Sequence, residues 1–165
     1  WPDADMLPLG TLDQGRRQTR FTHDEQVTML TLWSIARSPL ILGADLTKLD
    51  ESTLALITND EVIAVDQEST GGRQLFSRDG FLAWVADVPG SADKYLAVFN
   101  TRNPPAEPAT APGDKVPVNL TELGFTNAAR VRDLWLKADL GPRTDEFAPE
   151  IPWHGAGLYR VSAAN

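Results

Sequence analysis

The feature that most constrains the fold of this 165-residue chain is a change of hydrophobic pattern at residues 69–72 (STGG). Before this point, apolar residues recur at helical spacing or form short continuous runs, which is typical of helices and buried strands. After it, short apolar segments are separated by glycine, proline and aspartate, which predicts antiparallel strands. The pattern therefore predicts an α/β region over residues 1–69 and a β region over residues 70–165.

The clearest helix signal of the first region lies at residues 22–25 (THDE). Thr22 and Glu25 have the spacing of a capping box, in which each side chain accepts a backbone N–H of the other residue. No charged residue occurs from residue 27 to residue 36, so the helix is apolar around most of its circumference. Ser38 and Pro39 predict its end, because the residue before a proline avoids the helical region. Such a helix requires cover on more than one side.

The following segments predict a strand and a second helix. Residues 40–43 (LILG) form a short apolar run that is typical of a strand buried on both faces. A helix is expected over residues 52–58, with residues 61–65 continuing it after a break. Uncovered apolar surface costs about 25 cal/mol per Å², so these elements should not stay exposed. We expect upstream sequence, or a partner, to cover them.

The β region carries several turn signals. The Asp79-Gly80 pair between residues 74–77 and 81–86 predicts a tight hairpin. Residues 103–108 (NPPAEP) predict an exposed loop. Further strands are expected over residues 95–100, 116–120, 129–135 and 157–161. Together these segments predict an antiparallel sandwich.

The composition excludes several classes of function. The net charge of -8 argues against binding nucleic acid or an anionic membrane, and no apolar run is long enough to span a membrane. Without cysteine, the chain has no thiolate nucleophile and no cysteine-ligated metal. Neutral substrates such as sugars remain open. Because the chain begins with tryptophan rather than methionine, we interpret it as a fragment or a processed product.

The aromatic and histidine residues are mostly assigned structural roles. Trp33, Trp84 and Trp135 fall on apolar faces and are expected in the core. His23 lies in the first turn of a helix, so it is expected at the surface. His154 is far in sequence from the acidic segment described next, and a structural role is expected for it.

The opening residues 1–7 (WPDADML) hold the candidate site. On an extended strand, Asp3 and Asp5 point to the same side, where they could bind hydroxyl groups of a sugar. The alternatives are solvated loop acids or an oxygen-ligated Mg²⁺ or Ca²⁺, for which the segment supplies no further ligands. Trp1 is a candidate for stacking on a sugar face. The alternative is that its side chain packs beneath the edge of the fold.

The same residues resemble glycoside hydrolase family 27, the α-galactosidases. Residues 1–7 are similar to the family pattern WNDPDML, although Pro2 and Ala4 stand where the family usually has Asn and Pro. The resemblance continues, in the same order along the chain, through residues 22–26 (THDEQ), 32–40 (LWSIARSPL), 42–46 (LGADL), 56–67 (LITNDEVIAVDQ), 131–135 (VRDLW) and 153–155 (WHG).

The resemblance implies the last strands and helices of a (β/α)8 barrel over residues 1–69, then an antiparallel β-sandwich over residues 70–165. It implies hydrolysis of terminal α-galactosides with retention, by two aspartates that lie upstream and have no counterpart here. Asp5 then corresponds to a residue that hydrogen-bonds galactose hydroxyls, and Met6 lines the same pocket. Asp3 matches the motif without a defined role, and Trp1 completes the candidate substrate-binding set.

Further expectations follow from this reading. No catalytic residue, metal site or cofactor is assigned to the chain. The expected partners are an α-galactoside substrate and the remainder of the barrel, and a homo-oligomer is left open. The family favours a secreted or periplasmic protein. The alternative is a non-enzymatic carbohydrate-binding or interaction domain in which residues 73–165 are the working unit.

Overall fold

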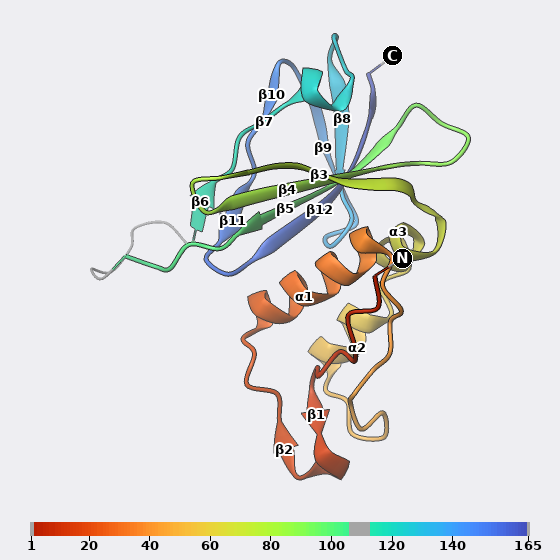
Figure 1. Ribbon diagram of the computed structural model, residues 1–165, viewed down its shortest axis with the longest axis vertical. Coiled ribbons are helices and arrows are strands. Elements are labelled where there is room, and N and C mark those ends of the chain that lie inside the picture. Colours follow the sequence, from red (N-terminus) through yellow and green to blue (C-terminus); the bar gives the residue numbers. More distant parts are fainter. Residues whose placement is uncertain (1, 106–112, 165) are drawn as a thin grey trace.

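The structure is a computed structural model that describes residues 2–105 and 113–164 (Figure 1). An N-terminal α/β region packs against a larger antiparallel β region. The elements of the first region are β1 (Thr11–Leu12), the 3-10 turn η1 (Asp13–Gly15), β2 (Arg17–Gln18), α1 (His23–Ala36), α2 (Glu51–Ile57) and α3 (Asp60–Glu68). Those of the second are β3 (Thr70–Arg78), β4 (Phe81–Asp87), β5 (Lys94–Asn100), β6 (Gly113–Lys115), β7 (Val118–Asn119), η2 (Leu120–Leu123), β8 (Ala129–Asp133), β9 (Ala138–Arg143), β10 (Glu146–Phe147), β11 (Glu150–Pro152) and β12 (Ala156–Ala163).

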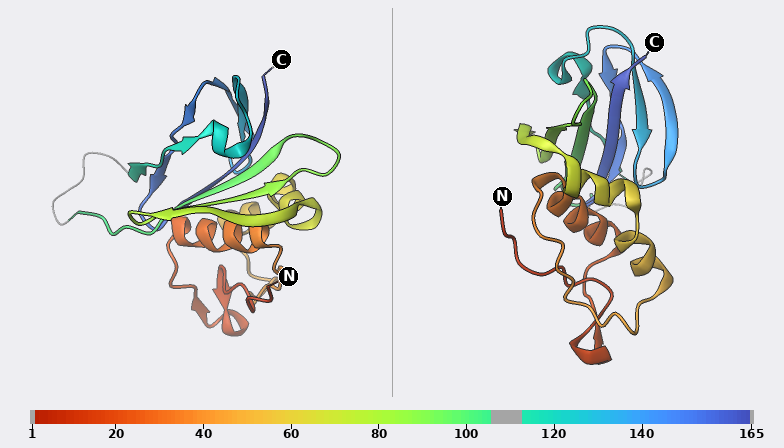
Figure 2. Two further views of the ribbon diagram at one scale, coloured as in Figure 1. Left: turned by 45° about the horizontal axis from the view of Figure 1, so that its top comes forward. Right: turned by 90° about the vertical axis from the view of Figure 1, so that its right-hand side faces the viewer.

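Helix α1 begins and ends as its local sequence predicts. The Glu25 N–H donates to Thr22 Oγ1 at 3.2 Å, and the Thr22 N–H donates to Glu25 Oε2 at 2.8 Å, which completes the capping box. At the other end, Arg37 adopts a left-handed conformation with φ 56°. Leu30 and Ile35 are buried, and the helix lies beneath the large sheet beside α3 (Figure 2). The charge-free helix is thus covered on the side that faces the β region.

The break between the second and third helices lies at Asn59. Its side-chain oxygen accepts the backbone N–H groups of Glu61 and Val62, so a new helix begins there. Asp50 caps α2 in the same way, accepting the Thr53 N–H at 2.7 Å. The expected helix, break and continuation are confirmed, with α3 longer than predicted.

The strand expected at residues 40–43 is wrong for this chain. Only Leu42 pairs, through a single parallel bridge to Leu7, and Ile41 is 52% exposed. A buried strand needs a paired neighbour on each side and cover on both faces. Among the described residues, only the segment around Leu7 pairs with it, so the run remains irregular.

The large sheet has six antiparallel strands in the order β3-β4-β5-β12-β8-β9. The β3–β4 hairpin turns at Asp79 and Gly80, whose φ values of 52° and 78° are the positive angles that a two-residue type I′ turn requires. Strands are also confirmed at residues 95–100, 129–133 and 157–161. Only Val118–Asn119 of the strand expected at 116–120 is formed, and a 3-10 turn follows it.

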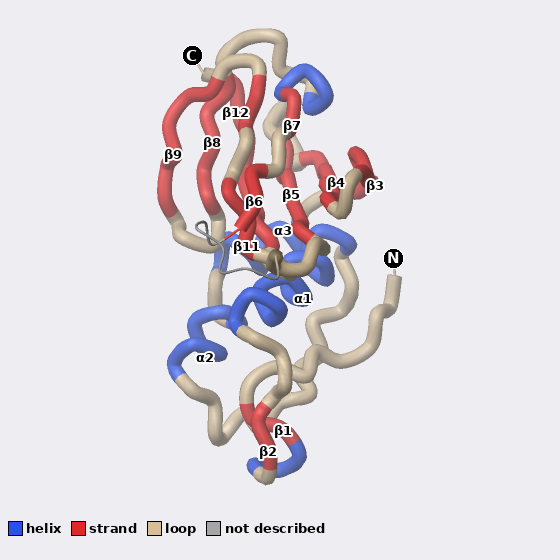
Figure 3. The backbone as a smooth tube through the Cα atoms, turned by 90° about the vertical axis from the view of Figure 1, so that its left-hand side faces the viewer, coloured by secondary structure: helices blue, strands red, loops and turns tan. Residues whose placement is uncertain are grey.

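Alternating side chains give the large sheet a core on each face. In β4, Trp84 and Ala86 contact the core shared with α1, whereas Ala83 and Val85 contact the opposite core. The two-stranded sheets β7–β10 and β6–β11 pack on that opposite face (Figure 3). Residues 103–105 are exposed and irregular, as expected for the loop, while the rest of that segment lies outside the described residues.

Polar contacts join the two regions beneath the sheet. The Asn59 amide donates to the carbonyls of Leu134 and Trp135, at 3.0 and 3.3 Å. Glu61 and Arg132 form a two-point ion pair, with N–O distances of 2.7 and 2.6 Å. The helix cap that starts α3 therefore also holds the turn after β8.

Candidate functional site

Asp5 and Met6 line a hollow of about 370 Å³. Pro8 and Gly43 line it as well. The β1–β2 hairpin and its turn contribute Leu12, Asp13 and Arg17. The hollow therefore joins the segment singled out in the sequence to a hairpin that directly follows it.

The position of the hollow follows from the parallel bridge. The Leu7 N–H donates to the Ile41 carbonyl at 2.7 Å, and the Gly43 N–H donates to the Leu7 carbonyl at 2.9 Å. Pro8 and Gly43 are the residues that directly follow the bridged pair Leu7 and Leu42. Asp5 and Met6 directly precede Leu7, so the residues that line the hollow lie on both sides of this bridged residue along the chain.

Asp5 is held in an unusual backbone conformation. Its φ is 71°, a left-handed value that aspartate tolerates better than most residues. Its Oδ1 accepts the Met6 N–H at 2.7 Å, and the Trp33 indole N–H donates to its backbone carbonyl at 3.1 Å. A side-chain contact from α1 thus fixes the residue that carries the carboxylate.

The predicted alternation of Asp3 and Asp5 on an extended strand is wrong, because the left-handed turn at Asp5 reorients its side chain. Both acids are exposed, but only Asp5 lines the hollow. Met6 lines it too and is 55% exposed. Trp1 lies outside the described residues. The structure therefore brings Asp5 and Met6 together and leaves Asp3 apart.

The chemistry of the hollow suits a neutral ligand with hydroxyl groups. An exposed carboxylate accepts hydrogen bonds from hydroxyls, and Met6 supplies apolar surface for the carbon face of a ring. Within residues 2–105 and 113–164, no three histidine, aspartate or glutamate side chains gather as metal ligands would. No helix in these ranges is long and apolar enough to cross a membrane.

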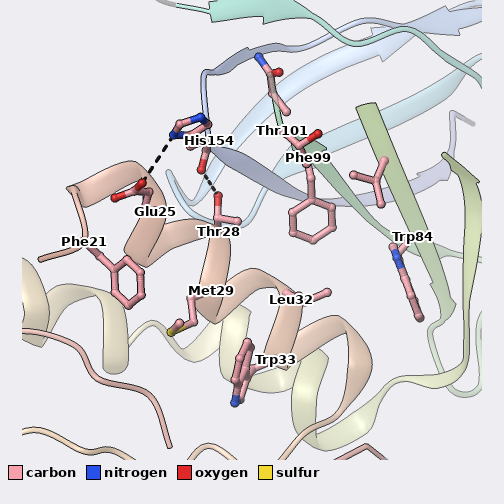
Figure 4. Close-up of a pocket in the computed structure, with 12 residues that line it drawn as sticks. Phe21, Glu25, Thr28, Met29, Leu32, Trp33, Trp84, Phe99, Thr101 and His154 are labelled. Carbon is pink, nitrogen blue, oxygen red and sulfur yellow. Dashed lines mark hydrogen bonds and ion pairs between the residues drawn. The ribbon is translucent and has the colours of Figure 1, made fainter. Parts of the chain in front are cut away.

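A second concavity has a different character. A groove of about 490 Å³ lies between α1 and strands β4 and β5. Figure 4 shows that its apolar wall is formed by Phe21, Met29, Leu32, Trp33, Trp84 and Phe99. Its few polar groups are at one edge, so it lacks the hydrogen-bonding groups that orient a sugar. We interpret it as a packing surface.

The polar edge of this groove gives His154 a structural setting. Its carbonyl accepts the Thr28 hydroxyl at 2.6 Å, and its ring lies 3.5 Å from the Glu25 carboxylate. The pKa of Glu25 is lowered, chiefly because the Thr22 N–H stabilises its charge, with His154 adding to the effect. These contacts join the start of α1 to the turn after β11.

The remaining expectations for histidine and tryptophan have mixed outcomes. His23 is exposed, as predicted, with its Nδ1 3.2 Å from Ser52 Oγ. Trp135 is partly buried and donates to Thr31 Oγ1 at 2.9 Å. Trp33 and Trp84 are also only partly buried, because one side of each faces the groove.

Two family models match the chain in succession. The model described as "Alpha galactosidase A" matches residues 1–68, and the model described as "Alpha galactosidase C-terminal beta sandwich domain" matches residues 79–161. The matched regions and the fold define the C-terminal portion of a glycosidase. The chain belongs to glycoside hydrolase family 27, the family of the α-galactosidases.

Similar proteins with curated names include the α-galactosidase of Cyamopsis tetragonoloba and α-galactosidase 3 of Arabidopsis thaliana. Their sequence identities to this chain are 28% and 29%, and each alignment covers 96% of the chain. The chain spans only 36% and 35% of their lengths. It therefore matches about a third of each of these enzymes.

Solved structures of similar glycosidases also match this chain. A family 27 β-L-arabinopyranosidase from Geobacillus stearothermophilus, in complex with arabinose, is 40% identical over the whole chain, with a TM-score of 0.87. α-Galactosidase I from Mortierella vinacea is 24% identical, with a TM-score of 0.82, and supports the fold alone. The chain covers 38% and 41% of these structures.

Sequence reasoning did not find the hairpin side of the hollow. Asp13 and Arg17 lie eight and twelve residues after Asp5, in a segment without hydrophobic periodicity. The available signal was the turn-forming triplet Asp13-Gln14-Gly15 directly after the acidic segment. Such a turn predicts that the chain reverses and returns toward the residues before it.

Proposed function

We propose that this chain is the C-terminal part of a retaining α-galactosidase that hydrolyses terminal α-D-galactosides. In this proposal residues 1–69 are the last strands and helices of a (β/α)8 barrel, and residues 70–165 are the β-sandwich domain that follows it. The order of the two family matches supports this division. So does the parallel bridge between Leu7 and Leu42, since barrel strands are parallel.

The observation that carries the proposal is the hollow lined by Asp5 and Met6. We assign Asp5 as a hydrogen-bond acceptor for sugar hydroxyls and Met6 as an apolar wall. Asp5 Oδ1 accepts the Met6 N–H, which leaves Oδ2 to accept from the substrate. Asp3 and Trp1 remain candidates for the outer rim of the same pocket.

The reacting groups belong to the longer protein in this account. Retention requires two carboxyl groups about 5–5.5 Å apart, one that attacks the anomeric carbon and one that protonates the leaving oxygen. Family resemblance assigns both to upstream barrel strands. The role of this chain is then to bind and orient the sugar, and the 165-residue chain alone is expected to be inactive.

The rest of the barrel is the proposed partner of the apolar groove. Phe21, just before α1, and Met29 and Trp33 on α1 line this groove together with Trp84 and Phe99 of the sheet. Covering these side chains removes apolar surface from water, at about 25 cal/mol per Å². The longer chain would supply that cover.

A second candidate is hydrolysis of β-L-arabinopyranosides. It is favoured by the 40% identity to the Geobacillus β-L-arabinopyranosidase, which exceeds the identity to the named α-galactosidases above. The two sugars share the ring-hydroxyl arrangement from C1 to C4, and galactose adds a hydroxymethyl group at C5. An acceptor such as Asp5 could serve either ring. Assays of both aryl glycosides with the longer protein distinguish the two.

The test of the binding role is Asp5→Asn in the longer protein. Replacing a charge-assisted hydrogen bond by a neutral one is expected to lower kcat/KM for an aryl α-galactoside at least tenfold, with thermal stability unchanged. Asp139→Asn on exposed β9 is the matched control and should leave kcat/KM unchanged. Unchanged kinetics for Asp5→Asn would remove this residue from the substrate site.

A further inference from the structure

The β1–β2 hairpin lines the same hollow as Asp5 and Met6. It projects away from the sheet at the end of the molecule, directly after the acidic segment (Figure 1). Its tip turns through Asp13 and Gln14, whose φ values of 53° and 55° are both left-handed. The chain therefore returns so that Arg17 and Asp13 line the same space.

The hairpin is held in place by contacts outside itself. The Thr11 hydroxyl donates to the Lys48 carbonyl at 2.9 Å, and the Asp45 N–H donates to the Thr11 carbonyl at 2.7 Å. Gln18 Nε2 donates to Thr11 Oγ1 at 2.9 Å across the hairpin. Thr11, at the centre of this network, is 5% exposed. These contacts anchor the backbone that carries Asp13 and Arg17.

Arg17 and Asp13 are the polar groups that the hairpin contributes to the hollow. Both are exposed, and neither side chain has a hydrogen bond or ion pair with another residue in the described part of the chain. A guanidinium donates several hydrogen bonds in one plane, whereas a carboxylate only accepts them. Together they match the alternating donor and acceptor capacity of hydroxyl groups on neighbouring carbons.

We propose that the hairpin forms a second saccharide subsite, which binds the sugar on the leaving-group side of the scissile bond through Arg17 and Asp13. This inference rests on the proposed function, in which Asp5 and Met6 contact the first sugar. The enzyme then prefers leaving groups that are themselves sugars.

Charge favours a neutral saccharide over an anionic ligand. Asp5 and Asp13 place two carboxylates in the hollow beside the single guanidinium of Arg17. The local charge is therefore negative, and it repels a phosphate, sulfate or uronate group. A neutral polyol meets no such repulsion.

The test measures two substrates that share the first sugar, in the longer protein. Melibiose has a saccharide leaving group, and 4-nitrophenyl α-D-galactopyranoside has an aryl one. Arg17→Met is expected to lower kcat/KM for melibiose about tenfold and to change kcat/KM for the aryl substrate less than twofold. Arg17→Lys keeps the charge but loses the planar donor pair, so an intermediate loss is expected.

Arg16→Met is the matched control, because Arg16 is equally exposed on the hairpin but does not line the hollow. Both substrates should keep their wild-type values in this variant. If Arg17→Met changes both substrates equally, or neither, the subsite is overturned while wild-type turnover of the aryl substrate still supports the proposed function. Absence of wild-type turnover on both substrates overturns the proposed function and the subsite with it.

Discussion

The two regions of the molecule differ in how completely they bury their apolar side chains. The β region covers both faces of its large sheet, with helices on one side and the small sheets on the other. In the α/β region, large apolar side chains remain exposed among the described residues. They are Met6, Phe21, Leu32, Ile41, Leu46 and Leu54, against Leu136 alone after residue 69.

The two regions therefore differ in the exposure of their large apolar side chains. Met6, Ile41 and Leu46 lie on the segments around the parallel bridge, Phe21 and Leu32 line the groove beside α1, and Leu54 lies on α2. Contiguous exposed apolar surface in a folded protein marks an interaction site. The comparison indicates that the β region is covered within this chain, on one face by helices of the α/β region, whereas the α/β region leaves apolar side chains for further sequence to cover.

The largest expected effect compares a buried leucine with an exposed isoleucine. Leu96→Ala removes a fully buried side chain of β5 and should lower the free energy of unfolding by about 3 kcal/mol. Ile41→Ala, at a site that is 52% exposed, should cost less than about 1 kcal/mol in this chain. Denaturant unfolding of both variants measures the difference.

The same isoleucine sharpens the comparison in the longer protein. If the remaining barrel covers residues 40–43, Ile41→Ala should cost about 2–3 kcal/mol there. An equally small cost in both proteins would contradict the view that the α/β region is covered by further sequence. An equally large cost would show that the side chain is already buried in the shorter chain.

A smaller effect is expected at the junction of the two regions. Asn59→Ala removes the cap of α3 and leaves the Leu134 and Trp135 carbonyls without their donor, for an expected loss of about 2–3 kcal/mol. Asn119→Ala is the control, since Asn119 caps the short turn η2 at an exposed site. Its expected cost is about 1 kcal/mol or less. Equal losses in thermal or denaturant unfolding would mean that Asn59 acts as a local cap only.

Features encoded by neighbouring residues were predictable from the sequence. The capping box at Thr22 and Glu25 and the Asp79-Gly80 turn depend on contacts within a few residues, and both are formed. The strand at residues 138–143 gave no signal, because it contains glycine and proline and lies at the edge of the sheet.

Features that depend on distant contacts were not predictable in the same way. The exposure of Ile41 reflects which segments are available to pair with it, which its own sequence does not contain. The left-handed turn at Asp5 is supported by a hydrogen bond from Trp33, 28 residues away. The placement of Arg17 on the same hollow as Asp5 likewise depends on the path of the hairpin, which the network around Thr11 anchors.

The candidate site was therefore found only in part. Residue types and family resemblance identified Asp5 and Met6, because the motif is contiguous. The other residues required the backbone path of the hairpin, which places Asp13 and Arg17 on the same hollow.

The most direct test of the central claim is hydrolysis of 4-nitrophenyl α-D-galactopyranoside by the purified 165-residue chain and by the longer protein under identical conditions. Circular dichroism should first establish that the shorter chain is folded. The account predicts nitrophenol release by the longer protein and none above buffer by the 165-residue chain, because the reacting carboxylates lie in the additional sequence. Turnover by the 165-residue chain at a rate comparable to the longer protein would contradict it.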